Sequence, residues 1–155
     1  MDSFNNLKLP LDYKTVKYRR TPDPQFDITN PNLLGEMYND KMDENKHDLG
    51  FLNKFGWKHF AWAFYKLLPG KWLPPHVDHF ENYTKHYNIK DKTKIKRSIV
   101  FLEDWRPGHV FCLENRIILN WRAGDYYTWR HDASHWGGNF GDEARYTLQL
   151  TGVYE

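Results

Sequence analysis

Short strand-like runs, separated by turn signals, follow one another from residue 60 to residue 153. The turn signals contain Pro, Gly, Asn or Asp, as in Pro69-Gly70 and Arg106-Pro107-Gly108. Seven short strands at this spacing predict a mainly β fold, either a sandwich or a barrel. The runs are rich in aromatic and β-branched residues, and they cover residues 60–68, 72–78, 95–103, 109–113, 116–121, 126–129 and 145–153.

The N-terminal part of the chain has a different texture. Residues 1–28 are polar and irregular, and their three prolines discourage long helices. Residues 30–38 have a helix-start signature, with Asn30 as the N-cap and Pro31 at the first helical position. We predict one domain over residues 1–155, with an N-terminal extension and buttressing helix in residues 1–59 and a strand core in residues 60–153.

The composition limits the kind of protein. The 155 residues include 7 Trp, 10 Tyr and 10 Phe, which suit a core between packed sheets. A net charge of +2 is too small to favour nucleic acid or a membrane surface as a partner. The single cysteine, Cys112, cannot form an internal disulfide, and no leader-like start or run of about 18 apolar residues is present. We expect a cytoplasmic protein with no membrane partner.

Histidine and aspartate residues in the strand region have the spacing of metal ligands. His76 and Asp78 are two residues apart, so on a strand both side chains leave the same face. A further ligand from a later strand would be His109, His131 or His135. Two imidazoles and one carboxylate on one face of a metal leave adjacent positions open, which is the arrangement of non-haem Fe(II) oxygenases.

A second candidate feature is the pair Arg145 and Thr147, which share one face of the last predicted strand. A guanidinium and a hydroxyl so placed can both contact one carboxylate. Taken alone, Arg145 would equally suit a salt bridge at the rim with Asp142 or Glu143.

Taken together, these residues resemble the pattern of the Fe(II)/2-oxoglutarate-dependent oxygenases. That pattern is His-x-Asp, a distal His and an Arg-x-Ser/Thr pair, here His76-Val77-Asp78, His135 and Arg145-Tyr146-Thr147. Arg145 follows His135 by ten residues, which matches the family, whereas it follows His131 by fourteen. The resemblance therefore implies that His76, Asp78 and His135 hold Fe(II), with His131 as the alternative distal ligand.

The same resemblance covers roughly residues 60–153 and implies a fold and a reaction. The fold would be a double-stranded β-helix (a cupin-like jelly roll) with one or two N-terminal supporting helices. The enzyme would oxidatively decarboxylate 2-oxoglutarate, held by Arg145 and Thr147, to succinate and CO₂. It would hydroxylate a protein side chain or a small molecule. The active-site half looks similar to compact prolyl-hydroxylase-like members, and bacteriophage-encoded versions, which would act inside an infected host cell, share this short form. The prolyl-hydroxylase group itself usually has Lys at the position of Arg145.

Two other classes of protein stay open. One is a cupin-type metal protein that does not use 2-oxoglutarate, although it would want a further Glu ligand in a His-x-His context. The other is a non-catalytic jelly-roll binding module. The insert at residues 80–94, which faces the substrate in the resembling family, carries four lysines; we interpret it as a solvated mobile lid in preference to a binding surface for nucleic acid.

Overall fold

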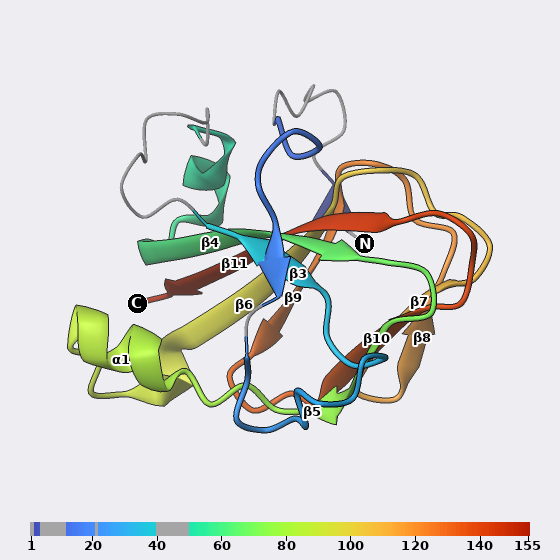
Figure 1. Cartoon of the computed structure of the whole chain (residues 1–155). Helices are drawn as coiled ribbons and strands as arrows, with labels where there is room; N and C mark the ends of the chain where they lie inside the picture. The colour runs from blue at the N-terminus through green and yellow to red at the C-terminus, as the bar shows by residue number, and fades with distance from the viewer. Residues whose placement is uncertain (1, 4–11, 21, 40–49) are drawn as a thin grey trace.

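The structure is a computed structural model that describes residues 2–3, 12–20, 22–39 and 50–155. These residues form two antiparallel β-sheets that pack face to face (Figure 1). The larger sheet has the order β1-β9-β6-β11-β4-β3-β2, with bounds Asp2–Ser3 (β1), Arg19–Arg20 (β2), Glu36–Tyr38 (β3), Lys58–Leu67 (β4), Ile95–Phe101 (β6), Asp125–Arg130 (β9) and Arg145–Val153 (β11). The smaller sheet has the order β5-β10-β7-β8, with bounds Trp72–His76 (β5), His109–Leu113 (β7), Arg116–Ile118 (β8) and His135–Asn139 (β10).

Strand β11 lies in the middle of the larger sheet and is covered on both faces. Its register runs from Arg145 opposite Leu67 on β4 to Val153 opposite Ile95 on β6. Successive side chains of a strand point to opposite faces. Leu148 and Leu150 accordingly pack in an outer cluster, while the side chains of Arg145 and Gln149 line a cavity on the inner face.

The apolar core consists of two clusters, one on each face of the larger sheet. The outer cluster covers the far face of the larger sheet and includes Phe64, Val100, Leu148 and aromatic side chains of the N-terminal segment. The inter-sheet cluster joins the two sheets through side chains of β6, β7, β8 and β9. In it, the Phe101 ring stacks on Trp121 with centroids 3.9 Å apart. Aromatic side chains thus pack in both the outer cluster and the inter-sheet cluster.

The seven predicted strands are confirmed as β4, β5, β6, β7, β8, β9 and β11, with some ends shifted. An eighth strand, β10, was not predicted because Gly137-Gly138 reads as a turn. Here the glycines are extended and lie between β5 and β7. A Cβ on Gly138 would come within 2.7 Å of the exposed Phe140 ring, so the glycine lets that ring lie against the strand.

The predicted helix over residues 30–38 is wrong. The Asn30 side chain accepts a hydrogen bond from the backbone N–H of Asn32 in a turn, and the Leu34 N–H bonds to the carbonyl of Trp72. The chain then continues into β3, which pairs with β4. The local helix signals do not decide the structure of this segment. The free edge of β4 offers it backbone hydrogen bonds, and Leu33 and Leu34 are both buried.

Helical support comes instead from two other segments of the chain. A 3-10 helix, η1 (Gly50–Phe55), packs Leu52 and Phe55 against the outer cluster. The segment predicted as a lid contains α1 (Glu81–Tyr87) and η2 (Lys92–Lys94). Tyr83 and Tyr87 of α1 donate hydrogen bonds to the carbonyls of His59 and Phe60, which tie this helix to β4. Across the described residues, the helices are all too short or too polar to cross a membrane.

The inter-sheet cluster generates a stability prediction. Phe101→Ala should lower the free energy of unfolding by about 3–5 kcal/mol, because it removes a fully buried ring and leaves a cavity against Trp121. Ile117→Ala is the control, since Ile117 is 64% exposed and should change stability by no more than about 0.5 kcal/mol. Urea denaturation followed by tryptophan fluorescence measures both. Equal effects of the two changes would contradict the assigned core.

Candidate metal centre

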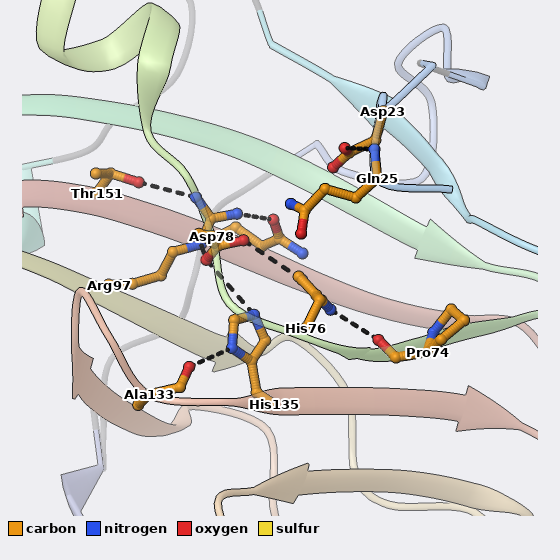
Figure 2. Close-up of polar contacts among 10 residues, drawn as sticks. Asp23, Gln25, Pro74, His76, Asp78, Arg97, Ala133, His135 and Thr151 are labelled. Atoms are coloured by element: carbon orange, nitrogen blue, oxygen red, sulfur yellow. Dashed lines mark hydrogen bonds and ion pairs between the residues drawn. The ribbon is translucent and has the colours of Figure 1, made fainter. Parts of the chain in front are cut away.

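His76, Asp78 and His135 converge on one point at the end of the smaller sheet (Figure 2). Their potential ligand atoms all lie within 4.8 Å of one another. The Nε2 of His76 is 3.4 Å from Asp78 Oδ1, and the Nε2 of His135 is 3.5 Å from Asp78 Oδ2. The two histidines are register partners on β5 and β10, so the unpredicted strand β10 is what brings His135 to the site. Asp78 lies just beyond the end of β5, although it was predicted within that strand.

Backbone carbonyls orient both imidazoles. Nδ1 of His76 lies 2.8 Å from the carbonyl oxygen of Pro74, and Nδ1 of His135 lies 3.1 Å from that of Ala133. An imidazole that donates from Nδ1 keeps the lone pair of its Nε2 free. In both residues that Nε2 is the atom that faces Asp78, which is the orientation metal-binding histidines adopt.

Burial and neighbouring charges set the charge states of His135 and Asp78. Burial lowers the pKa of His135 to about 4, and His76 adds to this effect while Asp78 opposes it. Burial alone would raise the pKa of Asp78, but Arg97 and then the two histidines hold it well below its usual range. At neutral pH His135 is therefore neutral and Asp78 is ionised. These are the forms that bind a metal ion.

Arg145 faces the same cavity as the three candidate ligands. The cavity has a volume of about 100 Å³, and its wall includes His76, Asp78, His135, Tyr65 and Arg145. Arg145 is 6% exposed and its Nη1 donates a hydrogen bond to the Val110 carbonyl at 2.9 Å. Burial lowers its pKa to about 10, so the guanidinium remains charged at neutral pH.

The donor groups around Arg145 are incompletely used. Within the described part of the chain, neither Arg145 Nε nor the buried Thr147 Oγ1 has a hydrogen-bond partner. The rim salt bridge does not form, because Glu143 pairs with Arg106 and Arg145 has no carboxylate partner among the described residues. Gly137 makes room for the guanidinium, since a Cβ there would lie 3.1 Å from Arg145 Nη1. A buried cation with free donors is chemically able to bind an anion.

The other two histidine candidates lie outside the cluster. His109 is 2% exposed, contacts the Glu143 carbonyl through Nε2 at 2.8 Å and stacks beside Trp121. His131 follows β9 in a turn and is not among the residues whose ligand atoms meet. Tertiary structure thus selects His135 as the residue that joins His76 and Asp78.

Sequence reasoning missed Arg97, whose Nε lies 3.2 Å from Asp78 Oδ2. The structure places it in β6, on the face that looks toward the cavity. Its position within a predicted strand was the available signal, because a cation on the inner face of a strand requires a buried partner.

Comparison with solved structures identifies the fold. A prolyl-4-hydroxylase from Pseudomonas putida matches with a TM-score of 0.57 at 14% identity, over 78% of this chain and 72% of that one. The cupin domain of Cnp3 from Schizosaccharomyces pombe matches with a TM-score of 0.53 at 8% identity, over 91% and 71%. A protein of Photorhabdus luminescens matches with a TM-score of 0.50 at 9% identity, over 88% of both chains. The fold is the cupin double-stranded β-helix. The predicted jelly roll is therefore confirmed.

Similarity at these identities concerns the cupin fold alone. No protein-family model matches the chain, and no curated protein matches it by sequence. Within this cupin fold, the His-Asp-His cluster is a candidate metal site. Its place in the cavity wall follows from the structure of this chain and not from a match to another sequence.

The choice of distal ligand is open to direct test. His135→Ala should abolish Co(II) binding, because it removes one of three converging ligand atoms, whereas His131→Ala should bind Co(II) like the unchanged protein. Isothermal titration with Co(II) and the visible absorption of the bound ion measure this. Loss of binding in His131→Ala together with normal binding in His135→Ala would overturn the assignment.

Buried neutral histidines also predict a pH dependence of stability. Burial, and then Arg145 and Arg106, lower the pKa of His109 from 6.5 to about 4. Between these pH values the unfolded chain binds a proton that the native state does not, so stability falls as the pH drops from 6.5 to 4 and levels off below that. His109→Gln should make this decline shallower in metal-free protein, whereas the exposed His86→Gln should leave it unchanged. Urea midpoints across this pH range measure the slope, and equal slopes in the two variants would contradict the prediction.

Proposed function

We propose that this protein is an Fe(II)- and 2-oxoglutarate-dependent oxygenase. It would oxidatively decarboxylate 2-oxoglutarate to succinate and CO₂ and hydroxylate a substrate, which is a protein side chain or a small molecule. One observation carries the proposal. A His-Asp-His cluster and a buried, incompletely paired arginine face the same cavity.

The donor set favours iron as the metal. His76, Asp78 and His135 supply two nitrogens and one oxygen, and Cys112 lies elsewhere, with its Sγ directed to the Glu114 carbonyl. Three protein ligands with open positions suit non-haem Fe(II) better than the closed, thiolate-rich sites of structural zinc. When bound, the iron supplies the activation of O₂ and the redox chemistry.

The remaining requirement is a carboxylate partner for Arg145. 2-Oxoglutarate has a 2-oxo acid group at one end, suited to a metal, and a carboxylate at the other. The free Nε of Arg145 and the hydroxyl of Thr147 are donors for that distal carboxylate. Burying Arg145 without an anion is unfavourable, so binding of the dicarboxylate relieves a cost that the folded protein carries.

Apolar side chains shield the site from water. The cavity wall includes Leu73, Ile99 and Phe111, and the Trp129 ring lies 4.9 Å from that of His135 between centroids. On the other side, the Phe26 ring meets His76 edge-on at 5.2 Å. A water-poor cavity strengthens the attraction between Arg145 and a carboxylate and keeps solvent from the reacting centre.

Two alternatives remain to be separated from this proposal. A cupin metal protein that does not use 2-oxoglutarate would bind metal at the same cluster and leave Arg145 without a cosubstrate. A non-catalytic binding module would bind neither. Arg145 and Thr147 favour the oxygenase, because the other two classes do not need their free donors.

The decisive experiment loads anaerobic protein with Fe(II), adds 2-oxoglutarate and records the visible charge-transfer band of the chelate. Arg145→Met should leave Fe(II) binding intact but weaken 2-oxoglutarate binding by roughly 100-fold, since a buried charge-assisted pair is lost. Arg145→Lys should recover part of the affinity, because it restores the charge without the planar fork. Arg122→Met, at an exposed arginine, is the matched control and should behave like the unchanged protein.

The outcomes distinguish the three classes of protein. A band that depends on Arg145, with succinate formed on admission of O₂, supports the oxygenase. Iron binding without a band, at millimolar 2-oxoglutarate, would overturn it in favour of the cupin metal protein. No iron binding would favour the non-catalytic module.

A further inference from the structure

Arg97 extends from the larger sheet to the His-Asp-His cluster and contacts Asp78 directly (Figure 2). Its Nε lies 3.2 Å from Asp78 Oδ2, and the two side chains form an ion pair. Its Nη1 donates to the hydroxyl of Thr151 at 3.1 Å, and its Nη2 donates to Oε1 of Gln149 at 2.7 Å. Every nitrogen of the guanidinium therefore has a partner.

Strand pairing sets the plane of this guanidinium. Thr151 is the register partner of Arg97 in the β6–β11 pair, and Gln149 lies two residues along β11 on the same face. The ring of Phe80 lies 5.9 Å from Arg97 Cζ and limits movement on another side. With 22% of its side chain exposed, Arg97 is oriented by four neighbours, so it is a fixed group and not a free anchor for another anion.

Asp78 has less support of its own. It follows the end of β5 in a segment without strand or helix structure. Among the described residues, its carboxylate contacts His76, His135 and Arg97. Two of these are candidate ligands of the same ion, which leaves Arg97 as the contact that comes from outside the cluster.

We propose that Arg97 is a positioning residue of the metal centre. Through this ion pair, Arg97 fixes the Asp78 carboxylate beside His76 and His135, where it would bind a metal ion. Its positive charge also compensates the carboxylate before a metal binds. The inference rests on the metal site of the proposed function, but it does not depend on 2-oxoglutarate.

This role gives β11 a second task at the site. Arg145 and Thr147 lie at one end of its inner face, where the cosubstrate would bind, and Gln149 and Thr151 continue that face toward Arg97. The alternation of a single strand would thus position both the cosubstrate pair and, through Arg97, the metal-binding carboxylate.

The test uses Co(II), whose visible spectrum reports coordination geometry, in protein without 2-oxoglutarate. Arg97→Met should weaken Co(II) binding roughly 10–100-fold and change the shape of the d–d absorption, because the Asp78 carboxylate loses the partner that fixes it. Arg97→Lys should recover part of the affinity. Arg130→Met is the control: Arg130 lies on the neighbouring strand β9, its Nε is 3.4 Å from Asp132 at the surface, and its loss should change neither measurement.

A purely structural role for Arg97 would lower the melting temperature but leave the Co(II) affinity and spectrum of Arg97→Met unchanged, and that result would overturn the proposal. If Arg97→Met does not fold, Gln149→Met keeps Arg97 and removes one partner; it should change the spectrum in the same direction by a smaller amount, and an unchanged spectrum would overturn the proposal.

The unchanged protein separates this inference from the proposed function. Co(II) binding that depends on Arg97, in a protein with no 2-oxoglutarate band, would support the positioning role and overturn the oxygenase. An Arg145-dependent band, together with Co(II) binding that is unchanged in Arg97→Met, would support the oxygenase and overturn the positioning role. No Co(II) binding by the unchanged protein would overturn both.

Discussion

Hydrogen bonding of β11 to β4 on one side and to β6 on the other is the interaction around which the molecule is arranged. Because the strand is central, both of its faces are buried, and its alternation assigns a different task to each. Leu148 and Leu150 supply apolar surface to the outer cluster. Arg145, Thr147 and Gln149 stand on the inner face; Arg145 and Gln149 line the cavity, and Thr147, between them along the strand, is fully buried. The nine residues of β11, Arg145–Val153, therefore contribute both to the outer cluster and to the wall of the cavity.

Buried charge is the second constraint, and the two arginines near the cavity meet it differently. Arg97 has its charge compensated by Asp78 and its other nitrogens occupied by Gln149 and Thr151. Arg145 is more deeply buried and has only the Val110 carbonyl as a hydrogen-bond acceptor among the described residues. An arginine paired with a carboxylate orients that carboxylate. A buried arginine without a carboxylate partner favours the binding of an external anion. That difference is the physical basis for assigning the arginines to positioning and to binding.

Local patterns predicted the strands well and failed where tertiary contacts decided the outcome. Alternation and aromatic content identified seven of the strands, because half-buried strands must alternate. The Asn30-Pro31 signature predicted a helix, but pairing with the edge of β4 gave β3 instead. Gly137 and Gly138 indicated a turn, yet they belong to β10, where the guanidinium of Arg145 and the Phe140 ring lie close to the backbone. These contacts come from residues distant along the chain or on another strand, which no local window contains.

By itself, the sequence determined the types of donor, their order and their spacing: His76 and Asp78 near one strand end, His135 later, and Arg145 with Thr147 on one face of the last strand. It could not choose among His109, His131 and His135 without the spacing of a resembling family, and it gave Arg97 no role. Only the tertiary structure decided these points, because the pairing of β10 with β5 sets His135 beside His76. The pairing of β6 with β11 likewise turns Arg97 toward Asp78. Sheet register and packing fix the distances between strands that are far apart in sequence. A metal site requires its ligand atoms to lie at such fixed distances from one another.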